Sequence, residues 1–464
     1  MEEKTEITEM KPVLTPTGRG SMYDIPKIWV SQTTGDYSVK PTQRLRTRII
    51  SEFIAGASRL TDLSVLTHIL GMCKIGFEKI LEKKDYEIKL DSEVLFEEMK
   101  RAVDNYIEFD SWRKALGGSP SISALAEMHL HLDELVGISD AYYDGNMVQT
   151  AKEIIMHEYD SHVNVQDRFL DNAHTNDRPA TISLEDVCGS SKLMVSYNPG
   201  RKLKDLKEKE FYDRINKIHH KRKADTAQSN PKMIVALGGM NKGTPEEYKN
   251  MIDKIMSSHG GARIFVGTNS FKDEENEGGK CYKHVLCEAN AVSFNENEIR
   301  SVYHDLGGDR TEDLADIVQK FHIQAESNGY IPKTGQIIIC HTEGGAIAYR
   351  KPIEDGDENE NDCDKQKKMF EEALEMAVGG ASFRYMNGRF GSSEEIIDFS
   401  KTTCRAYDKF SHLFGRSINE LPEGMCGAVS YDLTKPGTPI PQGSITGAGA
   451  TFDGILVSYL APLI

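Results

Sequence analysis

A glycine-rich turn near the C-terminus, GSITGAGATFDGIL (residues 443–456), has the residue types and spacing of an anion-binding loop. Gly447 and Gly449 let the backbone turn tightly, and the residues after them can form a helix whose free N–H groups face the turn. Such a loop holds a phosphate without any side chain. The alternative is an ordinary glycine turn, because GxG alone is a weak pattern. The position of the turn, directly before the last helix that we expect, favours the phosphate interpretation.

A second polar stretch, NENE (residues 295–298), directly follows a predicted strand. Ligands of an open parallel sheet bind at the edge where its strands end. A carboxylate there, that of Glu298, can position Mg²⁺ through water, since Mg²⁺ prefers oxygen ligands and keeps several waters. The alternative is that these residues only cap the helix predicted for NEIRSVYHDL.

Other stretches with histidine or cysteine do not complete a recognisable site. HEYDSH (residues 157–162) places its histidines five apart, whereas the zinc-protease motif needs them four apart on one helical face. Cys281, His284 and Cys287 lack the second pair that a four-ligand zinc site requires. HLHLDE (residues 129–134) continues a helical run, and we expect it on a helix surface. The sequence contains neither GxSxG nor a P-loop motif, which removes the best support for a serine hydrolase or a P-loop NTPase.

The elements that would position these residues alternate between strands and helices in the second half of the chain. MIVALGG (residues 233–239) predicts a short buried strand, and GTPEEYKNMIDKIMSS follows it with a capping Thr and a Pro at the first helical position. ARIFVGT (residues 262–268), NAVSF (residues 290–294) and GQIIICHT (residues 335–342) predict further strands, with the helical pattern TEDLADIVQKFHIQAES before the last. This alternation predicts an α/β fold with a parallel sheet wrapped by helices.

Composition excludes several classes of protein. The formal net charge of -16 argues against a general nucleic-acid binder, which needs clustered Lys and Arg, although a small anionic ligand remains possible. No apolar run reaches the roughly 18 residues of a membrane span, so we expect no membrane partner. The start, MEEKTEITEM, does not resemble a signal peptide, and the eight cysteines are scattered. We therefore expect a cytoplasmic protein with reduced thiols.

The order of the pieces resembles that of the ADP-dependent sugar kinases, the glucokinase and phosphofructokinase family of the ribokinase-like superfamily. The resemblance spans roughly residues 50–464. It rests on the segments GASRLTD, ALGGSPSISAL, AHTNDRPATIS, NENE, IIICHT, ALEMAVGGASFRYMNG and GAGATF. It implies a ribokinase-like, Rossmann-type parallel sheet flanked by helices, with a smaller lid domain.

Domain boundaries are expected as follows. The length of 464 residues suggests two lobes, and residues 1–45, which have four prolines and little periodicity, are expected to form an extended N-terminal arm. The acidic residues 354–368 are expected to form a surface loop. The large α/β domain that binds nucleotide and substrate comprises residues 46–70, 110–135 and 230–464, and the lid or inserted segments comprise residues 71–109 and 136–229.

The resemblance also implies roles for individual residues and partners. The expected partners are ADP or another nucleotide and a sugar or sugar phosphate, with Mg²⁺ as cofactor when nucleotide is bound. In AHTNDRPATIS the Asn-Arg pair of the family is interrupted by one Asp. The implied residues are Asp62, Gly117, Gly118, Asn176 and Arg178 for the sugar; His341, Thr342, Gly447 and Gly449 for the nucleotide; Glu298 for the metal; and Gly447, Ala448, Gly449 and Ala450 for the catalytic segment.

Two motifs depart from the family pattern, at three positions. The GxGD aspartate, which takes the proton from the sugar hydroxyl, falls on Ala450, and alanine has no group that can accept a proton. Loss of a general base typically costs about 10² to 10⁴ in rate. The HxE motif falls on IFVGTNS, where Phe265 and Gly267 stand in place of His and Glu. Asp453 lies one helical turn after Ala450, but the turn is expected to aim it away from the loop centre.

Two functional hypotheses follow from this comparison. The first is a divergent ADP-dependent sugar kinase-like protein in which phosphoryl transfer is weak or lost. Positioning and charge stabilisation perform most of the catalysis in phosphoryl transfer, so the fold can retain some activity without its base. The second is a non-catalytic nucleotide- or sugar-binding or regulatory protein on a kinase scaffold.

Overall fold

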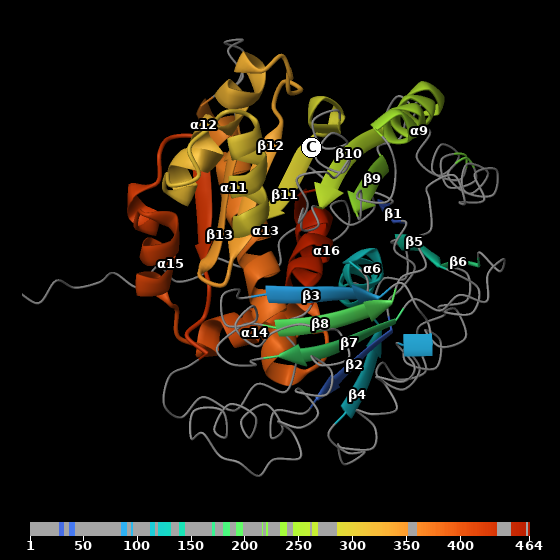
Figure 1. Ribbon diagram of the computed structural model, residues 1–464. Helices are drawn as coiled ribbons and strands as arrows, with labels where there is room; N and C mark the ends of the chain where they lie inside the picture. Colours follow the sequence, from blue (N-terminus) through green and yellow to red (C-terminus); the bar gives the residue numbers. More distant parts are fainter. Residues whose placement is uncertain are drawn as a thin grey trace, which may run out of the picture.

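A computed structural model gives the arrangement of the chain, and its core lies in the second half of the sequence (Figure 1). The residues that the structure describes are 27–31, 37–41, 85–90, 94–95, 112–116, 119–130, 139–143, 169–171, 180–185, 192–197, 216, 220, 233–238, 245–259, 262–267, 285–350, 360–433, 447–460 and 463–464.

A nine-stranded sheet forms the centre of the described structure, in the order β14-β13-β12-β11-β10-β9-β1-β5-β6. All neighbouring strands in it are parallel except β13, which pairs antiparallel with both β12 and β14. The α/β prediction with a parallel sheet is therefore confirmed. Its strands are β1 (Lys27–Ser31), β5 (Ser139–Tyr143), β6 (Phe169–Asp171), β9 (Met233–Gly238), β10 (Ala262–Gly267), β11 (Ala291–Asn295), β12 (Ile337–Thr342), β13 (Gly345–Arg350) and β14 (Met425–Val429).

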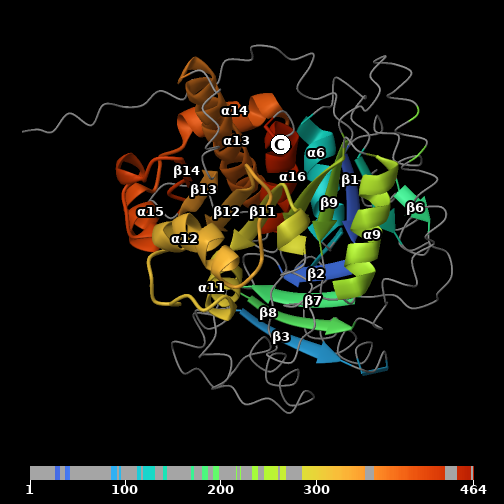
Figure 2. The ribbon, with the colours of Figure 1, turned by 90° about the horizontal axis from the view of Figure 1, so that it is seen from above.

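Helices cover both faces of this sheet, and each face has its own apolar core. Along β9, Ile234 and Ala236 pack into one core while Val235 and Leu237 pack into the other, as the alternation of a strand buried on both sides requires. Figure 2 shows α6, α13, α14 and α16 on one side and α9, α11 and α12 on the other. The helices are α6 (Ser119–Leu130), α9 (Pro245–Ser258), α11 (Glu296–Asp305), α12 (Leu314–Ser327), α13 (Glu360–Asn387), α14 (Ser393–Thr402), α15 (Tyr407–Phe414) and α16 (Ala448–Leu460), with a short 3₁₀ turn η5 (Ile418–Glu420).

The predicted elements of the second half occur close to their expected bounds. The α9 helix begins at Pro245, whose missing N–H costs nothing at a first helical position, and buries Met251, Ile252 and Ile255. The α12 helix lies within the predicted helical segment before β12. These segments are predictable because their apolar spacing and their capping residues favour the same structure.

A second sheet of five strands has the order β3-β8-β7-β2-β4. Figure 1 shows it on the side of the molecule toward which β9 and β10 point, that is, at the carboxyl ends of those strands. Open α/β sheets bind ligands at that edge. Its strands are β2 (Tyr37–Pro41), β3 (Asp85–Leu90), β4 (Trp112–Leu116), β7 (Ala180–Glu185) and β8 (Lys192–Tyr197).

Strand pairing corrects the prediction of an N-terminal arm. Residues 1–45 contribute β1 to the large sheet, between β9 and β5, and β2 to the smaller one. A five-residue strand is too short to show periodicity. Two of the prolines that suggested an arm adjoin these strands, since Pro26 directly precedes β1 and Pro41 ends β2, where a missing N–H is tolerated.

The expected domain boundaries also differ from the pairing of strands. β4 lies in the five-stranded sheet although residues 110–135 were assigned to the large domain, and β5 and β6 lie in the large sheet although residues 136–229 were assigned to the lid. β3, β7 and β8 come from the segments expected to form the lid. The chain passes between the two sheets several times, in one case between β1 and β2 over residues 32–36, and no sequence pattern marks these crossings.

Two smaller predictions are also corrected. The acidic stretch 354–368 is not wholly a loop, because α13 begins at Glu360. Glu, Gln and Lys are good helix formers, and the helix continues into a buried segment that stabilises its start. His129 lies on a helix, as expected, but it is buried and stacks on Phe390 rather than lying on the surface.

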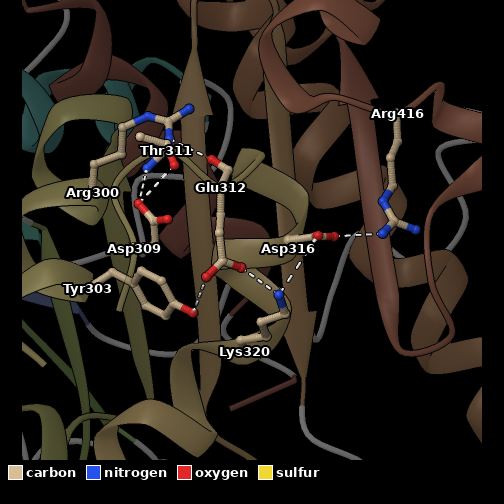
Figure 3. A network of polar contacts seen from close by, with 8 residues as sticks. All are labelled: Arg300, Tyr303, Asp309, Thr311, Glu312, Asp316, Lys320 and Arg416. Carbon is tan, nitrogen blue, oxygen red and sulfur yellow. Dashed lines mark hydrogen bonds and ion pairs between the residues drawn. The ribbon is translucent and has the colours of Figure 1, made fainter. Parts of the chain in front are cut away.

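A network of polar contacts connects α11 to α12 and to the segment after α15 (Figure 3). Arg300 of α11 donates to the carbonyl oxygens of Arg310 and Glu312, each at 2.7 Å. The carboxylate of Glu312 accepts from Tyr303 and pairs with Lys320, and Arg416 donates to Asp316 at 2.6 Å. These contacts fix α11 against the start of α12 and join α12 to the segment after α15. Within the described residues, no helix has the length and apolar character that a membrane crossing requires.

Candidate functional site

The glycine turn leads directly into the last helix, as predicted. Gly447 has φ of 84°, in the left-handed region that favours glycine, and α16 begins at the next residue. Thr451 closes the first turn because both its backbone N–H (2.9 Å) and its hydroxyl (2.8 Å) donate to the Gly447 carbonyl oxygen. The first N–H groups of an α-helix have no partner within the helix, so those that follow Gly447 are suited to an anion.

Arg384 of α13 reaches the same turn. Its Nη1 donates to the Thr451 hydroxyl at 3.0 Å, and its guanidinium lies 4.8 Å from the centre of the Phe390 ring. A methyl group added at Gly447 would lie 2.8 Å from Arg384 Nη1 and 2.5 Å from Ile122 Cδ1. The turn therefore has a guanidinium beside it and no space for a side chain at Gly447.

Ala450 is buried in the first turn of α16, only three residues after Gly447. Its carbonyl oxygen accepts a hydrogen bond of 2.6 Å from the hydroxyl of Ser123 on α6. The α6 helix packs closely on α16: a methyl group added at Gly454 would lie 2.2 Å from the Ser123 carbonyl oxygen. The backbone at Ala450 is thus held firmly, while its methyl group offers no proton acceptor.

His341 stands at the end of β12 and faces the glycine turn. A methyl group added at Gly449 would lie 2.9 Å from His341 Cε1, and the imidazole packs 4.9 Å from the Phe452 ring centre. Burial lowers the pKa of His341 to about 4, so the ring is neutral at pH 7. Thr342, by contrast, stabilises the β12–β13 hairpin, since its hydroxyl accepts a hydrogen bond of 3.0 Å from the Gly344 N–H.

Glu298 caps α11. Its carboxylate accepts from the Asn295 N–H at 2.8 Å, and the Asn295 side chain accepts from the Glu298 N–H at 3.0 Å. The capping alternative considered for NENE is therefore confirmed as a structural role of these residues. Glu298 is also buried, and Asn295 lies beside His341 across the β11–β12 pair, so the cap belongs to the same sheet edge as the glycine turn.

Asp453 lies one turn along α16 and points toward the ends of β10 and β11. Its Oδ2 lies 2.7 Å from the position of a methyl group added at Gly267, the cross-strand partner of Ser293. Burial raises the pKa of Asp453 to about 8; the Ser293 hydroxyl acts in the opposite direction, and the charge of Glu298 adds to the rise. The sequence did not predict this contact between Asp453 and the position where the resemblance places a missing glutamate.

Comparison with known proteins supports the fold assignment. A scan against protein-family models and a search of curated proteins give no match. Solved structures do match. A hypothetical ADP-dependent phosphofructokinase from Pyrococcus horikoshii OT3 is 14% identical, with 95% of this chain and 99% of that chain covered and a TM-score of 0.56. An ADP-dependent kinase in complex with fructose-6-phosphate and ADPβS is also 14% identical, with 95% of each chain covered and a TM-score of 0.57.

The last common ancestor of ADP-dependent phosphofructokinases from Methanosarcinales is similar at 13% identity, with a TM-score of 0.54 and with 95% of this chain and 94% of that chain covered. The protein has the fold of the ADP-dependent sugar kinases. This likeness of fold extends over nearly the whole of each chain.

Within this kinase fold, the described structure brings together only part of the predicted site. The glycine turn, Ala450 and His341 meet at one sheet edge, and Glu298 is buried beside it. Sequence reasoning missed Arg384, because a basic residue in the last turn of a helix is common and gives no signal of a role at a distant glycine turn. The predicted sugar-binding residues lie outside the described residues and stay predictions: Asp62, Gly117, Gly118, Asn176 and Arg178.

Proposed function

We propose that this protein binds a nucleotide with its phosphates at the glycine turn, and that it is a divergent sugar kinase-like phosphotransferase whose transfer step is weakened or lost. The observation that carries the proposal is the geometry of Gly447, which places a left-handed residue directly before α16. Helix N–H groups and the Arg384 guanidinium at this turn both attract negative charge.

Ala450 supports the weakened transfer step. The position is buried at the first turn of α16, beside the proposed phosphate, and carries a methyl group. A sugar hydroxyl placed there would keep its proton until water accepted it, which is slower than transfer to a positioned carboxylate. Electrostatic stabilisation by the turn would remain, so we expect a residual rate rather than none.

The sugar is expected between the glycine turn and the five-stranded sheet. That sheet lies at the carboxyl ends of β9 and β10 (Figure 1), and we propose that it acts as the lid. Closure of a lid excludes water and aligns the reacting groups, which is how a two-lobed kinase limits hydrolysis of its nucleotide. A sugar or a sugar phosphate is the proposed acceptor, because the neighbouring structures include an ADP-dependent kinase complexed with fructose-6-phosphate.

Mg²⁺ would accompany the nucleotide. Glu298 and the buried Asp453 Oδ1, which has no hydrogen-bond partner, offer the oxygen ligands that Mg²⁺ prefers. Mg²⁺ would supply charge neutralisation on the phosphates. The described residues contain no group of three or more His, Cys, Asp and Glu side chains placed to hold a metal, so this Mg²⁺ would depend on water and phosphate for its other ligands.

The second candidate function is a nucleotide- or sugar-binding protein without catalysis. It is favoured by Gly267 and Ala450 together, since both positions lack a carboxylate that the resemblance leads us to expect. In this case the turn and the lid would bind a ligand without transferring a phosphate.

Nucleotide binding tests the proposal that the two functions share. We expect ADP, at 100 times its dissociation constant, to stabilise the folded chain by about 2.7 kcal/mol, seen as a higher melting temperature. Adenosine, which lacks phosphates, should give much less. A melting temperature that neither ADP nor ATP changes would contradict the proposal.

A further inference from the structure

Two series of hydrogen bonds end at the carbonyl oxygen of Gly447. In the first, Arg384 Nη1 donates to the Thr451 hydroxyl at 3.0 Å, and that hydroxyl donates to the Gly447 oxygen at 2.8 Å. The second series begins where the Ser123 hydroxyl donates to the Ala450 oxygen at 2.6 Å. The N–H of the same peptide unit, which belongs to Thr451, donates to the Gly447 oxygen at 2.9 Å. Side chains of α13 and α6 therefore both act on this one oxygen through the first turn of α16.

The Gly447 oxygen shares its peptide unit with the N–H of Ala448, the first residue of α16. Resonance spreads charge over the planar peptide unit, so donors that bind its oxygen make its N–H a stronger donor. This N–H precedes the first hydrogen bond of the helix and has no partner within the helix. Gly447 and Ala448 are both partly exposed, so a ligand can reach this peptide unit.

Burial keeps water from replacing either hydroxyl group. Ser123 and Thr451 are each 1% exposed, and hydrogen bonds in series in such a site strengthen one another by about 10–30% per bond. The series through the Thr451 hydroxyl begins at a charged guanidinium, and charge-assisted hydrogen bonds are about twice as strong as neutral ones. It also reaches the Gly447 oxygen without an intervening peptide unit. Thr451 should therefore affect the Ala448 N–H more than Ser123 does.

We propose that Thr451 and Ser123 are positioning residues for phosphate binding, which act through the peptide unit between Gly447 and Ala448 and strengthen its N–H as a donor to the phosphate. The inference rests on the proposed function for the identity of the anion. It gives a role to two buried hydroxyl groups whose hydrogen bonds go to the backbone rather than to a ligand. A donor that is polarised before the ligand arrives stabilises charge on the phosphoryl group without reorganisation.

Isothermal titration of the full-length protein with ADP and with adenosine tests the role of Thr451. Thr451→Val keeps the shape of the side chain but removes the hydroxyl. We expect about tenfold weaker ADP binding, with adenosine binding within about twofold of the unmodified protein. Thr451→Ser retains the hydroxyl and should bind ADP within about threefold of the unmodified protein.

Thr402→Val is the matched control for this change. The Thr402 hydroxyl also donates to the carbonyl oxygen four residues earlier, that of Asp398 at 2.9 Å, but at an exposed position of α14. This variant should bind ADP as the unmodified protein does. ADP binding by Thr451→Val that equals or exceeds that of the unmodified protein would overturn the proposal, as would equal losses for ADP and adenosine.

Ser123→Ala gives a second test that leaves the sequence of α16 unchanged. Because its effect passes through one more peptide unit, we expect about threefold weaker ADP binding and unchanged adenosine binding. Ser458→Ala is the control, since Ser458 is buried in α16 and its hydroxyl donates within that helix to the Gly454 oxygen at 3.3 Å. Equal ADP affinities of Ser123→Ala and Ser458→Ala would overturn the proposal for Ser123.

The ¹⁵N chemical shift of Ala448 separates this inference from the proposed function. The shift is sensitive to hydrogen bonding at the Gly447 oxygen, because both atoms belong to one peptide unit. Without nucleotide, we expect it to move in Thr451→Val and to return in Thr451→Ser. If these shifts are seen but the unmodified protein binds no ADP, the proposed function fails while the two series of hydrogen bonds stand. An unchanged shift in Thr451→Val would overturn the role of the Thr451 hydroxyl whether or not ADP binds.

Discussion

The imidazole of His341 lies directly against Gly449, so that a methyl group at position 449 would be 2.9 Å from His341 Cε1. This contact joins the end of β12 to the first turn of α16. Phe452 supports the ring from the same helix at 4.9 Å between ring centres. The backbone of the proposed phosphate turn is thus bounded on one side by a neutral aromatic ring, which leaves room for a glycine alone.

Replacement of Gly449 by Ala should therefore weaken nucleotide binding. The added methyl group must displace His341 or shift the first turn of α16, and we expect at least about a tenfold loss of ADP affinity, equal to about 1.4 kcal/mol. Isothermal titration with ADP measures it. The double variant Gly449→Ala with His341→Ala removes the obstructing ring and should recover affinity relative to Gly449→Ala. If both variants bind equally weakly, the contact with His341 is not what excludes a side chain.

Replacement of Gly447 by Ala should lower the free energy of unfolding by more than the cost of left-handed backbone strain alone. Gly447 has φ of 84° and neighbours within 3 Å, whereas Gly329 has φ of 80° and nothing within 4 Å of an added methyl group. Gly329→Ala is thus a matched control, expected to cost about 1–2 kcal/mol for left-handed backbone. Urea unfolding should show that Gly447→Ala costs at least about 1 kcal/mol more, because Ile122 and Arg384 must move. Equal losses would show that the turn is not tightly packed.

Replacement of Arg384 by Met should reduce the affinity for phosphate-containing ligands. The variant keeps much of the packing on Phe390 but removes the charge beside the turn, and we expect about tenfold weaker ADP binding at low salt. Arg389→Met is the control, because Arg389 also lies over an aromatic ring, that of Phe383, but is 49% exposed and pairs with Glu395. Titration of both variants with ADP and with adenosine separates phosphate binding from base binding. A loss of affinity that is equal for ADP and adenosine would contradict a role at the phosphate.

The lowered pKa values of His341 and His129 predict that stability falls in acid. Burial lowers the pKa of His341 to about 4, whereas the ordinary value is 6.5, so the unfolded chain takes up this proton first. The stabilising contribution is therefore complete above pH 6.5 and is lost as the pH falls from 6.5 toward 4. His129 acts in the same direction. We expect His341→Gln to lose less stability than the unmodified chain between pH 7 and pH 5, by on the order of 1–2 kcal/mol, in urea unfolding at both values. Parallel losses would contradict a buried neutral ring.

Sequence patterns predicted the sheet better than the site. β9, α9, β10 and the glycine turn were predictable because apolar spacing, a capping Thr and glycine punctuation agree locally. The strand Lys27–Ser31 pairs with β9, which lies more than 200 residues further along the chain, and no local sequence pattern indicates such long-range pairing. Asp453 was expected to point away from the loop centre, and its carboxyl group lies against Gly267 at the end of β10. The sequence could not predict this contact, because it depends on how α16 packs against the sheet.

The account depends most directly on Ala450. If the turn is a phosphoryl-transfer site that lacks its base, Ala450→Asp should increase phosphoryl transfer from ADP to a sugar or sugar phosphate by about 10² or more over the unmodified chain. Ala450→Asn introduces a side chain of the same size as Asp that cannot accept the proton, so this variant should not increase the rate. The measurement is the initial rate of sugar phosphate formation with fructose-6-phosphate and with glucose, at saturating ADP and Mg²⁺. The account predicts a gain for the Asp variant alone; an Asp variant that folds and binds ADP and sugar but transfers no faster than the Asn variant would contradict it.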